Sequence, residues 1–399
     1  MELKKYKMKD IVTFLNGRAY LMPELQDKGK YRILRVGNLS GGNDSWYYSD
    51  MELDENKYCE NGDLLYAWAC TFGPHLWKEE KVIYHYHVWK LIEKKERVDK
   101  IYLYYYLLYQ TPLYLGGVNG ATMVHITKQN MEKKTVYVPA SLPTQQKIAS
   151  ILSAYDRLIE NNTRRIRLLE QMAENLYKEW FVRFRFPEHE KVEMVNGLPK
   201  GWRAIHIKEL AQLKSGYAFK SEWFIEEGEA VAKIKDIGNI LMDTSSFSYV
   251  DKENCIKAKK FLLTTGDLTI ALTGATIGKI SIVPKHKGNI YTNQRLGKFF
   301  LGDKPMEKLP FLYCLFKQES MVSNIVNLSN SSSAQPNISP EQIEKIKILG
   351  NHDIISMYNK TCNPLFSNIL ALYSQNQLLT RQRDLLLPRL MSGKLEVKS

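Results

Sequence analysis

Two short segments of the sequence resemble motifs that bind phosphate or methylate amino groups, but each lacks part of its motif. A phosphate-binding loop has four residues between its glycines and a hydroxyl residue after the lysine. Here three residues separate Gly274 from Gly278, and Ile280 follows Lys279. Asn363-Pro-Leu-Phe366 is similar to the Asn-Pro-Pro-aromatic motif of amino-methyltransferases, yet no glycine-rich strand-to-helix turn precedes it. Neither segment predicts an enzyme.

Patterns for nucleases and metal sites are also incomplete. Glu188-His-Glu-Lys191 contains the Glu-x-Lys of nucleases without an upstream aspartate, and its histidine lacks the second histidine of a zinc protease. The pair His85-x-His87 and the five widely spaced cysteines have no companions at the spacing of metal ligands. The sequence therefore predicts no catalytic residues, no metal site and no disulfide framework.

Length, composition and charge favour several globular domains that bind a polyanion. The 399 residues are 44% hydrophobic and 25% charged, which is typical of globular proteins and leaves room for two or three cores. The net charge of +13 is spread along the chain rather than held in a tail. Such a surface suits a long polyanion such as DNA, although a basic surface also simply aids solubility. The amino terminus has no apolar secretion signal and no stretch is apolar enough to span a membrane, so the cytoplasm is the expected location.

An internal repeat organises the chain. Similar segments occur in the same order in both halves, and the offset between them grows from 199 to 212 residues. A slowly growing offset is what duplication followed by small loop insertions produces, so two equivalent domains are expected. The matched pairs are 9–20 with 208–219, 33–39 with 234–240, 62–67 with 266–271, 103–108 with 311–316 and 126–131 with 338–343.

Each copy of the repeat, residues 1–143 and 186–350, is expected to be an α+β domain with a curved β-sheet. Short β-branched and aromatic runs alternate with Gly-Asp and Gly-Asn turns, which is typical of strands. A helix is predicted over residues 98–110 and another at the equivalent position, 309–321.

Long amphipathic helices are predicted after each copy, over residues 144–185 and 351–399. Apolar residues recur at alternating steps of three and four, and about 38 helical residues make a helix about 57 Å long. Pro364 is expected to limit where the second helix starts or to kink it. The two helices are expected to pair antiparallel, and a coiled coil between copies of the chain is the alternative. The predicted packing residues are Ile148, Leu152, Tyr155, Ile159, Ile166, Leu169, Leu176 and Trp180 in the first helix, and Ile355, Phe366, Ile369, Tyr373, Leu379 and Leu387 in the second.

Several segments spread along the chain carry a resemblance to a known family. The chain resembles, over essentially its whole length, the specificity subunit of type I restriction–modification systems. The similar segments are 142–156 leading into the first long helix, 266–279, Asn293-Gln-Arg295, 333–339 and 382–394.

The resemblance implies a DNA-reading scaffold without enzymatic activity of its own. In this family two target-recognition domains alternate with two antiparallel helical conserved regions, and each recognition domain reads one half of a bipartite DNA site. The subunit recruits two modification subunits, which methylate adenine with S-adenosylmethionine, and two restriction subunits that use ATP and Mg²⁺. This chain is then expected to hold no cofactor. The alternative, from another class, is a stand-alone DNA methyltransferase or nuclease with a degenerate active site.

In this scheme the helices set the spacer between the half-sites, and polar loops of each domain read bases. The first copy departs from the family pattern at 68–75 and 84–88, as expected if the two domains read different half-sites. Expected DNA contacts are Arg18, Tyr20, Trp68, Phe72, His75, His85, His87 and Thr122 in the first copy, and Tyr217, Lys220, Thr273, Thr276, Lys279, Asn293, Gln294, Arg295, Gln335 and Asn337 in the second.

Other roles are open for several of these residues. The aromatic rings of Tyr20, Trp68 and Phe72 suit a core as well as base stacking. Asn293 suits a cap or turn, and Arg295 suits a structural ion pair.

Overall fold

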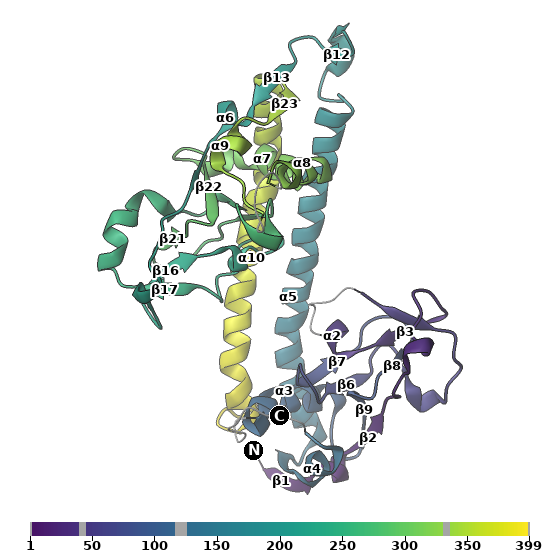
Figure 1. Ribbon diagram of the computed structural model, residues 1–399. Coiled ribbons are helices and arrows are strands. Elements are labelled where there is room, and N and C mark those ends of the chain that lie inside the picture. The colour runs from purple at the N-terminus through teal and green to yellow at the C-terminus, as the bar shows by residue number, and fades with distance from the viewer. Residues whose placement is uncertain (1, 40–44, 116–125, 330–335, 398–399) are drawn as a thin grey trace. The chain divides into compact units, whose positions relative to one another are not determined.

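A computed structural model describes residues 2–39, 45–115, 126–329 and 336–397, and it divides into two compact units (Figure 1). Unit 1 comprises Met1–Ile159 and Leu379–Ser399, and unit 2 comprises Glu160–Leu378. Both long helices contribute to both units. The two units therefore cut through the long helices, whereas the expected boundaries at residues 143, 185 and 350 separate the helices from the α+β domains. Those boundaries stay a prediction.

Unit 1 is built on two four-stranded sheets and one two-stranded sheet. The first sheet has the order β2 (Val12–Asn16), β9 (Val88–Glu93), β6 (Leu64–Ala67), β7 (Gly73–Leu76). The second has the order β4 (Tyr47–Ser49), β3 (Tyr31–Leu34), β8 (Val82–Tyr84), β5 (Tyr58–Cys59), and only its β3–β8 pair is parallel. The third pairs β1 (Leu3–Lys7) with β10 (Thr135–Pro139).

Unit 2 repeats this strand order. Its first sheet has the order β14 (Gln212–Ser215), β22 (Leu296–Phe300), β19 (Leu268–Ala271), β20 (Ile280–Ile282). The second has the order β15 (Phe224–Ile225), β17 (Ser248–Val250), β16 (Glu229–Ala232), β21 (Ile290–Thr292), β18 (Leu262–Leu263), again with one parallel pair, β16–β21. The third pairs β13 (Arg203–His206) with β23 (Lys347–Gly350). A small hairpin, β11 (Met194–Val195) and β12 (Leu198–Pro199), precedes them. The shared strand order confirms the internal repeat and the α+β fold.

The short helices also match between the units, with one correction. Unit 1 contains α1 (Met8–Ile11), α2 (Val36–Leu39), α3 (Lys100–Leu115) and α4 (Lys128–Lys133). Unit 2 contains α6 (Ile207–Leu210), α7 (Leu309–Lys317), α8 (Glu319–Ser329) and α9 (Pro340–Glu344). The single helix predicted over 309–321 is wrong, because Gln318 adopts an extended conformation between α7 and α8. The Gln318 side chain donates to the carbonyl oxygen of Cys314 and so helps to end α7.

Two long helices, α5 (Leu142–Tyr177) and α10 (His352–Met391), follow the two repeats, and a π-helical turn (Lys178–Val182) extends α5. The expectation that Pro364 limits where the second helix starts is wrong, because α10 begins at His352 and continues through the proline. The other expectation, a kink at Pro364, stays a prediction. Because proline has no N–H group, the carbonyl oxygen of Lys360 receives no helical hydrogen bond from Pro364. Both residues are exposed, so water can donate to that oxygen instead. None of the helices in the described part of the chain is long and apolar enough to span a membrane.

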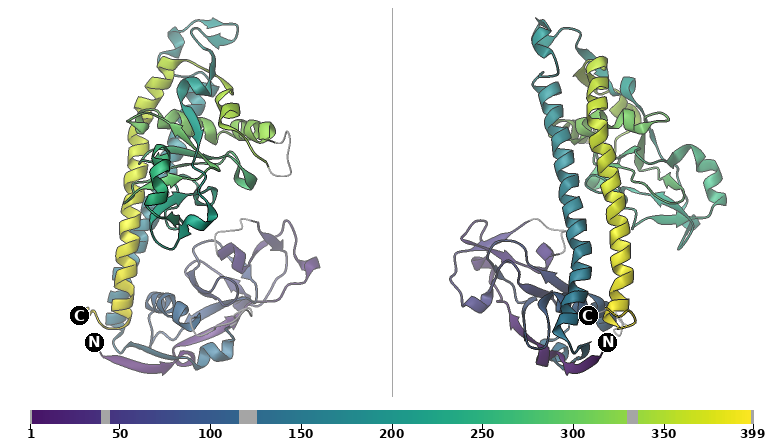
Figure 2. Two further views of the ribbon diagram at one scale, coloured as in Figure 1. Left: turned by 60° about the vertical axis from the view of Figure 1, so that its left-hand side comes forward. Right: turned by 180° about the vertical axis from the view of Figure 1, so that it is seen from behind.

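Within each unit the segments of α5 and α10 lie side by side and run antiparallel (Figures 1 and 2). In unit 2, Asn162 donates to Gln375 at 3.1 Å, and Tyr358 donates to the carbonyl oxygen of Ala173 at 2.7 Å. In unit 1, the Arg383 guanidinium lies 2.6 Å from the Asp156 carboxylate. Residue numbers on α10 therefore decrease as the numbers of their partners on α5 increase, which is the order that two antiparallel helices give.

The predicted packing residues all lie on buried or half-buried faces of α5 and α10. The two helices do not bury these faces alone. Ile148, Leu152 and Leu387 share a core with residues of α3 and β10 in unit 1, and Phe366 and Ile369 share a core with residues of α7 in unit 2. Each apolar stripe therefore packs against the α+β part of its own unit as well as facing the other helix.

Equivalent tyrosines attach the α+β part of each unit to α5. In unit 1, Tyr105 on α3 donates a hydrogen bond to Asp156, which also pairs with Arg383. In unit 2, Tyr313 on α7 donates to Glu170, which also lies 3.2 Å from the Lys317 ammonium. Burial raises the pKa of both tyrosines, so each hydroxyl keeps its proton and remains the donor.

Candidate nucleic-acid interface

Four segments of unit 2 converge through main-chain hydrogen bonds. Tyr217 forms a β-bridge with Asn293, just beyond the end of β21. The Tyr217 amide donates to the Thr292 carbonyl at 2.8 Å, and the Gln294 amide donates to the Tyr217 carbonyl at 3.0 Å. The amide of Leu272 donates to Arg295, and the amide of Ile338 donates to Leu272, each at 3.0 Å. We call these segments, 216–220, 272–279, 293–295 and 336–338, the unit 2 cluster. It brings together the predicted contact residues of unit 2 that the structure describes.

The unit 2 cluster offers several polar side chains to solvent. Gln294, Arg295 and Asn337 are exposed, as are Lys220 and Lys279. In the described part of the chain no carboxylate lies within ion-pair distance of Arg295, so the structural ion pair that was open for it is not formed there. An amide and a guanidinium side by side can read the donor and acceptor pattern of base edges.

The remaining predicted residues of the unit 2 cluster are partly covered. The amide oxygen of Asn293 accepts from the main-chain nitrogen of Arg295 at 3.3 Å, so that side chain does shape the turn. The hydroxyl oxygens of Thr273 and Thr276 are buried, with no hydrogen-bond partner among the described residues. Tyr217 is half-buried against Phe219 and Phe261. Gln335 lies outside the described residues.

Unit 1 contains the same arrangement of main-chain hydrogen bonds. Arg18 forms a β-bridge with His85, and the Tyr86 amide donates to the Arg18 carbonyl at 3.0 Å. The Trp68 amide donates to the His87 carbonyl at 3.2 Å. These positions correspond to Tyr217, Asn293, Gln294, Leu272 and Arg295 in unit 2. We call the equivalent segments of unit 1, 17–20, 68–75 and 84–88, the unit 1 cluster.

The unit 1 cluster is aromatic where the unit 2 cluster is polar. The Tyr86 ring lies 4.0 Å from that of His87 and 4.4 Å from that of His85, and the Trp68 indole donates to the Tyr86 carbonyl at 2.8 Å. Tyr86 is 39% exposed, whereas the described residues predicted from the sequence in this unit are half-buried. Tyr86 was missed, although its alignment with Gln294 was a signal that could have found it.

Several predicted residues of unit 1 have structural partners. Arg18 forms two hydrogen bonds to Glu24, at 2.7 and 2.9 Å, and its guanidinium lies 5.2 Å from the Tyr20 ring. Trp68 and Phe72 pack at the edge of the unit 1 core, which supports the core role that was open for them. His75 lies on β7, opposite Leu65. Thr122 lies outside the described residues.

Burial favours the neutral form of two histidines of unit 1, His85 and His75. Desolvation, with a smaller contribution from His87, lowers the pKa of His85 to about 4. Desolvation also lowers the pKa of His75. Neutral imidazoles can donate or accept hydrogen bonds, but they bring no positive charge to a phosphate.

A glycine in each cluster permits the close approach of two chain segments. A Cβ atom on Gly17 would lie 2.4 Å from the carbonyl oxygen of His85, and one on Gly216 would lie 2.2 Å from that of Thr292. Real Cβ atoms do not come this close to backbone, so only glycine fits at either position. These are the glycines that the first matched pair of the repeat contains.

An ion pair that is largely shielded from solvent occurs at the same position in both units. In unit 1, Lys90 lies 2.6 Å from Asp63, and in unit 2 Lys298 lies 2.6 Å from Asp267. Each aspartate also accepts a hydrogen bond from the main chain three residues before it, which explains the repeated Gly-Asp turn. The ion pair links strand β9 or β22 to the turn that carries the aspartate.

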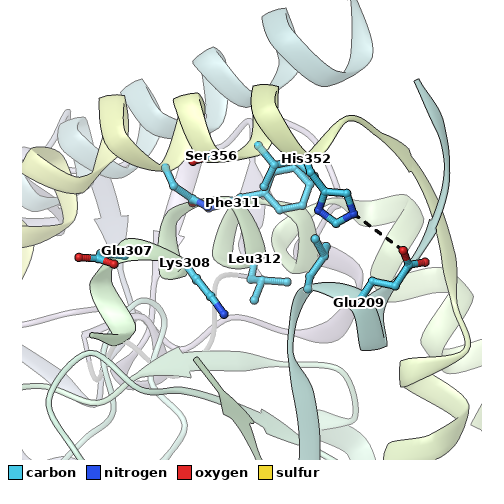
Figure 3. A pocket seen from close by; sticks show the side chains of 10 residues that line it. Glu209, Glu307, Lys308, Phe311, Leu312, His352 and Ser356 are labelled. Carbon is cyan, nitrogen blue, oxygen red and sulfur yellow. Dashed lines mark hydrogen bonds and ion pairs between the residues drawn. The ribbon is translucent and has the colours of Figure 1, made fainter. Parts of the chain in front are cut away.

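A pocket outside the clusters lies between α6, α7 and the start of α10 (Figure 3). It has a volume of about 390 Å³, an apolar lining that includes Phe311, Leu312 and Ile355, and a charged rim. On that rim Glu209 lies 3.8 Å from His352, and its hydrogen bond to Arg203 lowers the pKa of Glu209 to about 2. The pocket contains no nucleophile held by a base among its described lining residues.

No metal site is found in the described ranges, where no three histidine, cysteine, aspartate or glutamate side chains gather at suitable distances. The segment 274–279 forms a 3₁₀ turn between β19 and β20 instead of leading from a strand into a helix. Asn363 to Phe366 lies inside α10. The geometry of these two segments matches neither a phosphate loop nor a methyltransferase motif.

Comparison with protein families defines the class to which this fold and these clusters belong. The family model for the type I restriction modification DNA specificity domain matches residues 1–171 and 199–349. Because the two matched ranges cover well over half of the sequence, the chain belongs to this family. It is a DNA sequence-recognition protein, and the two matches coincide with the two halves of the internal repeat.

Individual relatives and one solved structure agree with this assignment. The type I restriction enzyme MjaVIII specificity subunit of Methanocaldococcus jannaschii is 27% identical over 349 residues, covering 85% of this chain and 80% of the relative. The HindI specificity subunit of Haemophilus influenzae is 26% identical and covers 69% and 72%. The crystal structure of a type I restriction–modification S subunit from M. genitalium has a TM-score of 0.59 at 18% identity, covering 98% of this chain and 96% of that one, and shows the common fold.

Proposed function

We propose that each unit reads one half of a bipartite DNA site for a type I restriction–modification complex. One observation carries this proposal: the two clusters share the same main-chain hydrogen bonds but present different side chains. Tyr86 and His87 in unit 1 occupy the positions of Gln294 and Arg295 in unit 2. A common frame with different donors and acceptors is what reading two different half-sites requires.

The long helices are proposed to set the spacer between the half-sites and to dock the modification subunits. The outward faces of α5 carry Leu158, Leu168 and Met172, which are 52%, 49% and 56% exposed, among exposed arginines. Large apolar side chains at helical spacing on an exposed face suit contact with partner helices. In the full complex, two modification subunits and, through them, two restriction subunits would assemble on this chain.

The chain itself is proposed to be non-catalytic and to bind no cofactor. S-adenosylmethionine, ATP and Mg²⁺ would act in the partner subunits, within the cytoplasm. The relatives are named as specificity subunits of restriction enzymes, which supports a division of labour between recognition and catalysis.

A domain exchange tests this function. Replacing residues 1–143 with the recognition domain of another family member should change the methylated sequence in one half-site only, because unit 2 keeps its own cluster. Sequencing of methylated adenines in cells that carry the complete system measures this. Changes in both halves, or methyl transfer from S-adenosylmethionine by the purified chain alone, would contradict the proposal.

A further inference from the structure

A lysine-rich 3₁₀ helix, η7 (Glu253–Phe261), lies against the unit 2 cluster. The hydroxyl of Thr292, the residue before Asn293, donates to the carbonyl oxygen of Phe261 at 3.0 Å. The ring of Phe261 lies 6.0 Å from the ring of Tyr217. The carboxyl end of η7 is therefore attached directly to two segments of the cluster.

The spacing of its residues fixes which face of η7 points outward. In a 3₁₀ helix, side chains three residues apart lie above one another. Cys255, Ala258 and Phe261 form one such column, and they pack in a core with Phe219 and Tyr291. The other two columns are Glu253, Ile256 and Lys259, and Asn254, Lys257 and Lys260. All of these residues are exposed except Asn254, which is half-buried, so the outer side carries three lysines and one glutamate.

The three lysines of this face are not committed to carboxylates. Other lysines of unit 2 are: Lys298 pairs with Asp267 at 2.6 Å and Lys317 with Glu170 at 3.2 Å. For Lys257, Lys259 and Lys260, no ion pair is present in the described part of the chain. Three free ammonium groups on one short helix make a local positive surface beside the cluster.

At the corresponding position, the described residues of unit 1 form no such surface. The strand pairing aligns Val250 with Ser49 and Leu262 with Tyr58. Between these positions unit 2 has residues 251–261, whereas unit 1 has only residues 50–57, with the three-residue helix η2 (Glu55–Lys57). The one lysine of that shorter segment, Lys57, donates to the carbonyl oxygen of Asn16 at 2.8 Å.

We propose that η7 binds the sugar–phosphate backbone of duplex DNA, with Lys257, Lys259 and Lys260 contacting phosphates next to the bases that unit 2 reads. The proposal rests on the proposed function and adds a site for affinity and register to the site for sequence. Lysine is a flexible point charge that suits a phosphate and carries no base pattern. An acidic protein surface would also attract lysines, but the direct attachment of η7 to the base-reading segments favours DNA.

A charge-removal experiment on the full-length chain tests the phosphate contacts. The triple variant Lys257→Ala, Lys259→Ala, Lys260→Ala should bind a fluorescent duplex of arbitrary sequence more weakly, and the slope of log K against log salt concentration should fall by about one per lysine. The matched control is Lys208→Ala, Lys345→Ala, Lys347→Ala, which removes three exposed lysines near the β13–β23 sheet of the same unit. The control should change the slope by less than one. A triple lysine-to-arginine variant of η7 should keep the slope of the wild-type chain.

The outcomes separate this proposal from the proposed function. Thermal melting should be unchanged in the alanine variant, because the three side chains are exposed. An unchanged salt slope, an equal fall in the control, or a changed methylated sequence would each overturn the phosphate role. Loss of modification-subunit binding with an intact salt slope would instead assign η7 to a protein partner. If wild-type unit 2 conferred no half-site specificity at all, the proposed function itself would fail.

Discussion

At the scale of residues, the two clusters share one main-chain frame and differ in the side chains that it carries. The frame consists of main-chain hydrogen bonds, and these bonds do not require a particular side chain at the exposed position. Gln294 and Tyr86 occupy the same position in that frame, and both are exposed. The residue at this position therefore differs between the units without loss of the shared main-chain contacts.

The exposed residue at this position should determine sequence preference in one half-site. Gln294→Ala should relax the preference at a base in the unit 2 half-site, with a loss of about 1–3 kcal/mol of discrimination. Tyr86→Ala should act only on the other half-site. Methylated-adenine sequencing measures both. Gln212→Ala, an exposed glutamine on β14, is the matched control and should leave both half-sites intact. An effect of Gln294→Ala on the unit 1 half-site would contradict this assignment.

The neutral state of His85 predicts that unit 1 loses stability on acidification. Burial holds the pKa of His85 at about 4, below its ordinary value. As pH falls from the ordinary histidine range towards 4, the unfolded chain binds the proton first, so the free energy of unfolding decreases. His85→Gln should remove part of that decrease in thermal melts between pH 7 and about pH 4.5. A wild-type chain whose pH dependence matches the variant would refute this.

At the scale of elements, two strand ends and a glycine turn position each cluster. The turn between β14 and η5 (Ser221–Trp223) passes so close to the end of β21 that no side chain fits at Gly216. The largely shielded pair of Asp267 and Lys298 ties the neighbouring turn to β22. Together these contacts hold the reading segments on rigid strands.

Gly216→Ala should therefore unfold or displace the unit 2 cluster. Its Cβ atom would meet the carbonyl oxygens of Thr292 and Asn293 at 2.2 and 2.5 Å, which should cost at least about 3 kcal/mol of unfolding free energy. Gly288→Ala is the control, because it has positive φ but no atom within 4 Å of its Cβ position. Backbone strain alone should cost it about 1 kcal/mol. Denaturant titration compares the two, and equal losses would count against the close-approach argument.

At the scale of the whole molecule, the two long helices connect the two units. Helix α5 is continuous from Leu142 to Tyr177 and contributes to both units. Its length along the chain is therefore proposed to set the number of unread base pairs between the half-sites.

A helix insertion tests this spacer role. Four extra residues next to Arg165, about one helical turn, should lengthen the nonspecific spacer and leave both half-sites unchanged. Methylated-adenine sequencing in the complete system reads out the spacer and the half-sites together. Altered bases within a half-site, with the spacer constant, would contradict the idea that helix length acts as a ruler.

The sequence by itself determined the repeat, the α+β class and the two long helices. These follow from local patterns: glycine and aspartate at turns, alternation in strands, and steps of three and four in helices. It also located most of the segments that form the two clusters, because the matched motifs fall on them. Pro364 misled the prediction of where the second helix starts, since α10 begins at His352 and the proline lies on an exposed helix face.

Only the tertiary structure decided which predicted side chains face solvent. Arg18 and Arg295 look alike in the sequence, but Arg18 pairs with Glu24, and no carboxylate among the described residues pairs with Arg295. The exposure of the Tyr86 side chain and the burial of the Thr273 hydroxyl depend on how strands distant in the sequence pack together. The physical reason is that burial and pairing depend on contacts between segments far apart along the chain, which local pattern does not record.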